Sequence, residues 1–351
     1  MKRIFYLDFI RVISCLIVVL FHISCYLVDV LNVKGCIFYL SANTSWGAIG
    51  VSFFFIISGV ALSYSYGEKN FDLKKYIKKR FLGIYPMFWI AYFLVFLYQI
   101  LKDPAQFSNI PVFNFIYTIF GLDGYLYTVA APNFYILGEW FLGVIIICYA
   151  LFPIILYFFK RFPKLLAVFS IITYVILILL FDSEYTHINI DMSVTAHLIE
   201  FIFGIYYVKY YDKIRLSGGI LAGLVFIIFL FVPFGIKNTN ISRMITTLCN
   251  IFGFVSISYF VNLLKNCQKI YSVFNASSKL TYSVFLLHHI IIYVLTMKVY
   301  NITNSITGVY IIDLIAVILA SFLFYYLYKL LCIVCKKILF NIRKGEKIGT
   351  D

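Results

Sequence analysis

The stretch FYLDFIRVISCLIVVLFHISCYLVD, residues 5–29, is an apolar run that nevertheless contains Asp8, Arg11 and His22. As a helix it is longer than the roughly 30 Å hydrocarbon core of a bilayer. It does not resemble a cleavable signal peptide, because the apolar run is too long and no small-x-small cleavage site follows. We therefore expect this stretch to form a transmembrane helix.

The whole chain has the composition of an integral membrane protein. Of its 351 residues, 63% are hydrophobic and only 13% are charged, which excludes a soluble domain. The formal net charge is +14, but the basic residues sit in short clusters between apolar runs. Such clusters are typical of topology signals and not of a nucleic-acid-binding surface. We predict an all-α membrane protein whose partner is the lipid bilayer and which binds no nucleic acid.

Apolar runs of membrane-spanning length recur along the chain and predict about ten transmembrane helices. No internal repeat, low-complexity linker or separate hydrolase-like domain interrupts them, so residues 1–351 are expected to form a single domain. The predicted spans are residues 5–29, 46–66, 84–102, 133–158, 165–181, 193–210, 217–236, 244–264, 279–298 and 308–333.

The distribution of Lys and Arg tests this span count independently of hydropathy. If the N-terminus is cytoplasmic, the inside segments hold most of the 29 basic residues. An odd number of spans would destroy this alternation, so the positive-inside bias predicts that both termini are cytoplasmic. The outside segments and their edges hold only Lys34, Lys102, Lys237, Arg243 and Lys298.

Two connections between the predicted spans carry additional signals. The basic segment from Glu68 to Arg80 is expected to form an amphipathic helix against anionic headgroups, or to act as a purely electrostatic anchor. The outer connection from Asp103 to Pro132 contains an apolar piece, Phe113 to Phe120, that is too short to span. We expect this piece to be re-entrant or interfacial.

The eight cysteines lie mostly inside apolar runs, so we expect no disulfide. Cys332 and Cys335 form a C-x-x-C pair at the end of an apolar helix, but no second ligand pair accompanies them. Packing is therefore the favoured role of this pair, and no metal site is predicted.

Ionisable side chains inside the first span are the strongest functional signal in the chain. Each costs at least about 2.5 kcal/mol to place in hydrocarbon, so each requires a partner or a function. Asp8, Arg11, Cys15 and His22 follow helical spacing along one stripe, and Arg11 and His22 are separated by roughly 16 Å of rise. Snorkelling of Asp8 and Arg11, or a simple interhelical hydrogen bond from His22, would also explain the pattern.

Other predicted spans contribute further polar groups, which together predict a polar cavity within the bundle. For His197 and His289 we favour structural hydrogen bonding between helices. Structural and functional roles remain equally open for the other three candidates, which are Glu139, Glu200 and His288.

Two motifs in the N-terminal part resemble those of the membrane acyltransferase-3 family, the O-acyltransferases of bacterial surface carbohydrates. The first is Tyr6-Leu7-Asp8-Phe9-Ile10-Arg11 with ten residues between Arg11 and His22, which resembles the family's R-x10-H signature. The second is Gly50-Val51-Ser52-Phe53-Phe54-Phe55-Ile56-Ile57-Ser58-Gly59, which resembles its second-helix motif.

Three more blocks follow in the family's order, so the resemblance extends over roughly residues 5 to 335. Gly83 stands where the family usually has a second arginine, and Thr281 and Phe285 replace a serine and a tyrosine. The blocks are Lys79-Arg80-Phe81-Leu82-Gly83-Ile84-Tyr85-Pro86, Glu200-Phe201-Ile202-Phe203-Gly204 and Leu280-Thr281-Tyr282-Ser283-Val284-Phe285-Leu286-Leu287-His288.

The resemblance implies a multi-pass protein of the bacterial plasma membrane that transfers an acyl group, most often acetyl, from cytoplasmic acyl-CoA. The acceptor would be a hydroxyl of a capsular, cell-wall or other surface polysaccharide, or of its polyprenyl-linked precursor. Catalysis would involve His22, as a general base or as an acyl carrier, with Asp8 and Glu139. No permanently bound cofactor is expected. The donor substrate, acetyl-CoA or another acyl-CoA, would be held by Arg11, Lys79, Arg80 and Ser58, and the acceptor by Glu200, Tyr282, Ser283 and His288.

A flippase or exporter of glycan intermediates is the alternative from another functional class. Ten spans with a polar interior also describe a transporter, although no inverted repeat and no paired broken spans favour one. The motifs do not separate acetyl from succinyl or another small acyl group. They also leave open the sugar, the acceptor hydroxyl and the oligomeric state.

Overall fold

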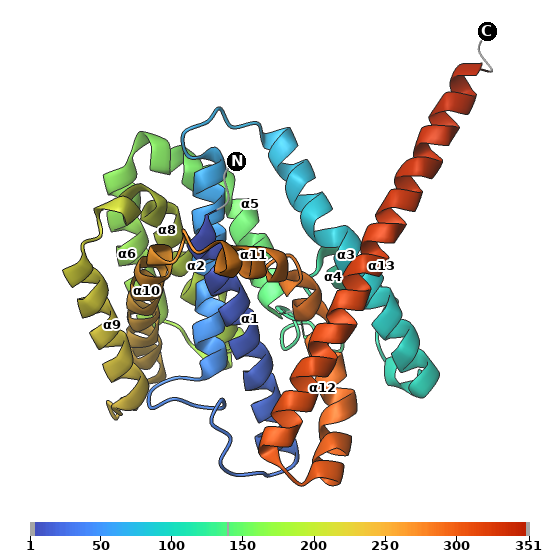
Figure 1. Cartoon of the computed structure of the whole chain (residues 1–351), viewed down its shortest axis with the longest axis horizontal. Coiled ribbons are helices and arrows are strands. Elements are labelled where there is room, and N and C mark those ends of the chain that lie inside the picture. Colours follow the sequence, from blue (N-terminus) through green and yellow to red (C-terminus); the bar gives the residue numbers. More distant parts are fainter. Residues whose placement is uncertain (1–3, 139, 349–351) are drawn as a thin grey trace.

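The computed structural model describes residues 4–138 and 140–348, which form a bundle of helices joined by loops (Figure 1). Three short helices lie in the connections: α4 (Phe115–Phe120), α7 (Ser183–Thr186) and α11 (Gln268–Ser277). The long helices are α1 (Phe5–Cys25), α2 (Trp46–Tyr66), α3 (Leu73–Lys102), α5 (Trp140–Arg161), α6 (Pro163–Leu179), α8 (Val194–Tyr210), α9 (Leu216–Phe231), α10 (Thr239–Leu263), α12 (Thr281–Thr303) and α13 (Ile306–Ile348).

The long helices correspond one to one with the predicted spans, and the prediction of an all-α membrane protein is confirmed. Seven of them within the described residues are long and apolar enough to cross a membrane, namely α1, α2, α3, α5, α10, α12 and α13. Helices α6 and α9 are apolar but shorter. The start of α1 and the end of α13 both point toward the upper side of Figure 1. The count of ten crossings and the cytoplasmic location of the termini stay predictions.

Side-chain caps explain where several helices begin. Ser45 Oγ accepts from the Ala48 amide at 3.1 Å before α2, and Asp72 Oδ1 accepts from the Lys75 amide at 3.0 Å before α3. Each cap satisfies an amide that has no partner within the helix. The basic segment expected from Glu68 to Arg80 becomes helical only at Leu73, where it continues into the apolar part of α3 without interruption. It therefore extends the third span and does not form a helix of its own.

The outer connection contains the short helix α4, which packs along α3. The Tyr85 hydroxyl donates to the Phe120 carbonyl at 3.1 Å, and the Trp89 indole donates to the Ile119 carbonyl at 3.2 Å. These aromatic donors of α3 satisfy carbonyl groups at the C-terminal end of α4. The apolar piece predicted at Phe113 to Phe120 is thus a six-residue helix held against α3 and too short to span.

Among the described residues, helices α2 and α8 have the most extensive contact of any two helices, and two glycines permit their approach. A Cβ atom at Gly59 would overlap the Phe201 carbonyl oxygen, and a Cβ atom at Gly204 would overlap the Ile56 carbonyl oxygen. Small residues at a transmembrane helix contact let the backbones approach, so that packing and polar contacts can form between the helices. This contact is what brings Ser52 of α2 next to Glu200 of α8.

We expect Gly204→Ala to destabilise the protein by about 1–3 kcal/mol, because the added methyl group has no space between the two backbones. Thermal unfolding of the detergent-solubilised protein measures this effect. Gly218→Ala in α9 is the matched control, since a Cβ atom there would meet only the Ile214 Cγ2 at 3.8 Å. An equal unfolding temperature for the two variants would contradict the importance of the α2–α8 contact.

Candidate active site

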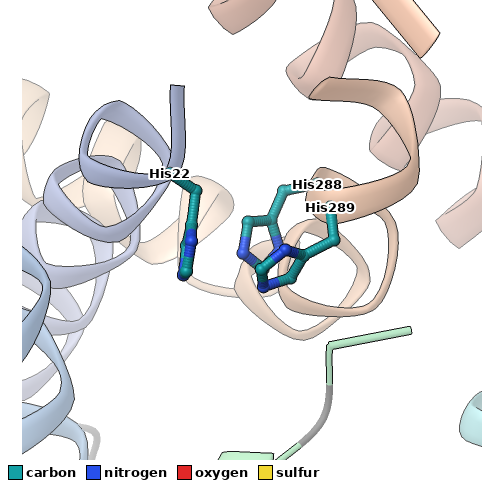
Figure 2. A group of neighbouring side chains, drawn as sticks. All are labelled: His22, His288 and His289. Atoms are coloured by element: carbon teal, nitrogen blue, oxygen red, sulfur yellow. The ribbon is translucent and has the colours of Figure 1, made fainter. Parts of the chain in front are cut away.

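Three histidine side chains converge inside the bundle, one from α1 and two from α12 (Figure 2). The ring of His22 lies 4.1 Å from that of His289 and 5.1 Å from that of His288, measured between centroids. The rings of His288 and His289 are 4.3 Å apart. One nitrogen of each ring lies within 4.8 Å of the others. We call these three residues the histidine cluster.

The hydrogen bonds of His288 determine which of its nitrogens carries a proton. Nδ1 lies 2.8 Å from the Phe285 carbonyl oxygen and 3.1 Å from that of Val284. Carbonyl oxygens only accept hydrogen bonds, so Nδ1 is the protonated nitrogen. Nε2 is buried without a hydrogen-bond partner among the described residues, and it therefore presents a lone pair inside the protein.

Imidazole nitrogens are metal ligands, and the histidine cluster is where the described residues could hold an ion. Three histidines bound to zinc at about 2.0–2.1 Å would bring their nitrogens to roughly 3.3 Å from one another. Spacings of up to 4.8 Å would have to contract to reach this value. A hydroxyl group placed between the rings could bridge spacings of this length by hydrogen bonds.

The first helix carries Arg11 three turns before His22, as its sequence predicts. Arg11 Nη1 lies 3.4 Å from Asp8 Oδ1, and the Arg11 side chain retains 28% of its exposure whereas Asp8 retains 6%. Asp8 therefore balances part of the charge of Arg11. The guanidinium group still lines a cavity of about 400 Å³, which we call the arginine cavity.

The arginine cavity brings together four residues that the sequence assigned to ligand binding: Arg11, Ser58, Arg80 and Tyr282. The Arg80 guanidinium lies 5.4 Å from the centroid of the Tyr149 ring. The Tyr149 hydroxyl in turn donates to Ser58 Oγ at 3.4 Å. Arg80 Nε is buried and has no hydrogen-bond partner among the described residues. Two guanidinium groups in one cavity favour an anionic ligand.

The structure places Lys79, the other basic candidate, away from this cavity. Lys79 is exposed and does not line it. Gly83 lines the cavity in the position where the resembling family usually has a second arginine, and a Cβ atom there would meet nothing within 4 Å. The cavity thus has open space where that second cation would lie.

A second cavity, of about 480 Å³, contains the His289 side chain in its wall. It lies between the C-terminal end of α3, the segment 135–138 and α12, and we call it the tyrosine cavity. The histidine cluster separates the two cavities along α12: Tyr282 and Phe285 line the arginine cavity, and Tyr293 lines the tyrosine cavity. The Phe285 ring lies 6.3 Å from that of His288.

Glu200 belongs to a buried polar network that lines neither of these two cavities. Its Oε1 accepts from Ser52 Oγ at 2.7 Å and from Arg243 Nη2 at 2.9 Å, and its Oε2 lies 2.8 Å from His197 Nδ1. Glu200 is 0% exposed and Arg243 is 2% exposed. Asn250 extends the network by donating to Ser52 Oγ at 2.9 Å. This arrangement joins α2, α8 and α10 to one another.

Two predicted site residues, Ser283 and Glu139, are not found at these cavities, for different reasons. Ser283 is buried, and its hydroxyl donates to the Leu280 carbonyl of its own chain segment at 2.7 Å. It lines neither the arginine cavity nor the tyrosine cavity. Glu139, predicted to assist catalysis, lies outside the described residues.

Sequence reasoning missed Arg243, which it treated as a charge at the outer edge of a span. A signal was present, because Arg243, Thr246, Thr247 and Asn250 follow spacings of three, four and seven residues. All four are buried, and they form a polar stripe on α10. Arg243 also lines a third, wide cavity of about 1130 Å³.

Asp123 in the outer connection is a second residue that the sequence analysis missed. It is 0% exposed, and burial raises the pKa of its carboxyl group to about 7. This carboxyl group therefore holds a proton up to nearly neutral pH. It lines none of the three cavities described above.

Comparison with known proteins agrees with the motifs. No curated protein and no solved structure matches the chain at a significant level. A sequence model of the acyltransferase-3 family, described as an acyltransferase domain, matches residues 4–327 and so covers nearly the whole chain. This match spans every helix that contributes to the histidine cluster and to both adjoining cavities. The chain therefore belongs to the acyltransferase-3 family and is a multi-pass membrane acyltransferase.

Proposed function

We propose that this membrane acyltransferase moves an acyl group, most simply acetyl, from cytoplasmic acyl-CoA to a hydroxyl of a bacterial surface glycan or of its lipid-linked precursor. The observation that carries the proposal is the histidine cluster between two cavities, one of which contains two arginines. The tyrosine cavity would bring the acceptor to His289, and the arginine cavity would bring the donor to Phe285, whose ring lies 6.3 Å from that of His288. The enzyme would act in the bacterial plasma membrane.

Charge supports the arginine cavity as the donor site. The phosphates of coenzyme A are anions, and Arg11 and Arg80 offer two guanidinium groups in the half of the bundle that the charge bias predicts to face the cytoplasm. From Arg11 to His22 the helix rises roughly 16 Å, a distance comparable with the length of an extended pantetheine arm. The thioester could then reach the histidine cluster while the phosphates stay at the arginines.

The chemistry requires one base and no permanently bound cofactor. His22 would take the proton of the acceptor hydroxyl as the oxygen attacks the thioester carbonyl carbon. Collapse of the tetrahedral intermediate breaks the carbon–sulfur bond, and the departing CoA thiolate takes the proton back from the imidazolium. The products are the glycan ester and free CoA, so atoms and charge balance without another reactant.

Membrane vesicles of known orientation test the proposal. The vesicles would enclose non-acylated glycan extracted from cells lacking the gene, and acetyl-CoA or succinyl-CoA would be added outside, at the cytoplasmic face of the protein. We expect free CoA to appear together with a glycan mass increase of one acyl unit. In empty vesicles of the same orientation, uptake of glycan added outside without any donor would support a transporter instead. The absence of both CoA release and acylated glycan in the first assay would overturn the proposal.

A further inference from the structure

We propose that the tyrosine cavity binds a sugar ring of the acceptor, with Tyr293 as the platform on which the ring stacks. The inference rests on the proposed transfer to a glycan and assigns the place where that glycan binds. Tyr98, Tyr135 and Tyr293 contribute aromatic side chains to the cavity, and Gln99 and Gln106 contribute amides.

Proximity to the histidine cluster distinguishes the tyrosine cavity from the wide cavity that Arg243 lines. His289 is part of the wall of the tyrosine cavity, and its ring centroid lies 4.1 Å from that of His22. The wide cavity is larger, but none of the three clustered histidines lines it. A hydroxyl group must be within hydrogen-bond reach of the base that removes its proton. A sugar in the tyrosine cavity would contact His289, whose ring adjoins that of the base His22, and is therefore better placed than a sugar in the wide cavity.

The chemistry of the wall suits a pyranose ring. The C–H face of a pyranose is apolar and packs against an aromatic face, whereas its rim of hydroxyls requires planar polar partners. Gln106 Nε2 donates to Gln99 Oε1 at 3.0 Å, which orients both amides and leaves other amide atoms for a ligand. The Lys102 ammonium lies over the Tyr293 ring, 4.9 Å from its centroid, so a sugar stacked on that face would displace this ammonium. The volume of about 480 Å³ lies within the range of small-molecule sites.

Gly138, at the end of the segment 135–138, packs directly against His289 of the histidine cluster. Gly138 has a φ of +78°, and a Cβ atom on it would overlap the His289 ring. Glycine is therefore required here both by backbone conformation and by space. Gly138 and His289 both line the cavity, so the imidazole ring of His289 is part of its wall at this contact.

The test compares Tyr293→Leu with the wild type in the vesicle assay, using the non-acylated glycan as the variable substrate. We expect the KM for this glycan to rise about tenfold, since a stacking platform is lost from the site. The KM for acetyl-CoA at saturating glycan should change less than twofold. Tyr293→Phe keeps the aromatic face and should retain a glycan KM near that of the wild type.

Tyr185→Leu provides the matched control, because Tyr185 is 85% exposed and lines none of the three cavities. If Tyr293→Leu fails to fold, Gln99→Leu replaces it and should raise the same KM. An unchanged glycan KM in a folded variant would overturn the sugar site. If the wild type itself transfers no acyl group, the proposed function fails, and this outcome is distinct from failure of the sugar site.

Discussion

Replacing His22 with alanine is expected to reduce acyl transfer about a thousandfold while the protein stays folded in the membrane. His22 contributes the imidazole that α1 brings to the cluster, and its ring lies beside both His288 and His289. The two remaining histidines lie on another helix and approach from the opposite side (Figure 2). They are therefore not expected to restore the base in the same position.

The O-acyl content of the surface glycan, measured by NMR, and CoA release by the purified protein would report this loss. His187→Asn is a suitable control, because His187 lies in a loop at a φ of +54°, a conformation that asparagine tolerates. Size-exclusion chromatography in detergent would show whether both variants remain folded. Normal O-acyl content in cells producing only His22→Ala would contradict the catalytic assignment.

Replacing Glu200 with alanine is expected to destabilise the protein by about 3–5 kcal/mol. The change would leave the guanidinium of Arg243, which is 2% exposed, without the carboxylate that accepts its 2.9 Å hydrogen bond. It would also remove the acceptor of Ser52 Oγ and the partner of His197 Nδ1. A buried charge without its partner costs far more than an exposed one, because water cannot solvate it.

Thermal unfolding in detergent measures this effect, and Glu184→Ala is the matched control. Glu184 is exposed in α7, so its loss should change the free energy of unfolding by less than about 0.5 kcal/mol. The double variant Glu200→Leu with Arg243→Met should recover part of the stability lost in Glu200→Ala, since the buried guanidinium, which would otherwise keep only its 3.4 Å ion pair with Asp191, is then absent. An unchanged unfolding temperature in Glu200→Ala, with a raised KM for the glycan, would instead support acceptor binding by Glu200.

The local features of the candidate site could be predicted because they depend on residues close together in the chain. The spacing of Asp8, Arg11 and His22 along α1 follows from helix geometry alone, and the observed Asp8–Arg11 contact at 3.4 Å agrees with it. The predicted spans likewise match helices, since length and apolar composition are local properties. Where a boundary differed, as at Leu73, the cap at Asp72 decided it.

The grouping of residues from different helices could not be predicted in the same way. Arg11 and Arg80 share a cavity because α1 and α3 both face it, and Arg243 reaches Glu200 because α10 packs beside α8. His289, for which the sequence favoured a structural hydrogen bond, joins His22 and lines a cavity. Each of these contacts depends on how helices rotate and approach one another, and single residues such as Gly59 and Gly204 control that approach.

By itself, the sequence determined the membrane class, the approximate positions of the helices and the stripe of ionisable groups on α1, since hydrophobicity and helical period act over one or a few turns. Only the tertiary structure decided that three imidazoles meet between two cavities, and that Glu200 is enclosed by Ser52, His197 and Arg243. The physical reason is that helix packing in lipid depends on small residues and buried polar contacts between distant segments. These contacts arise only when the helices assemble.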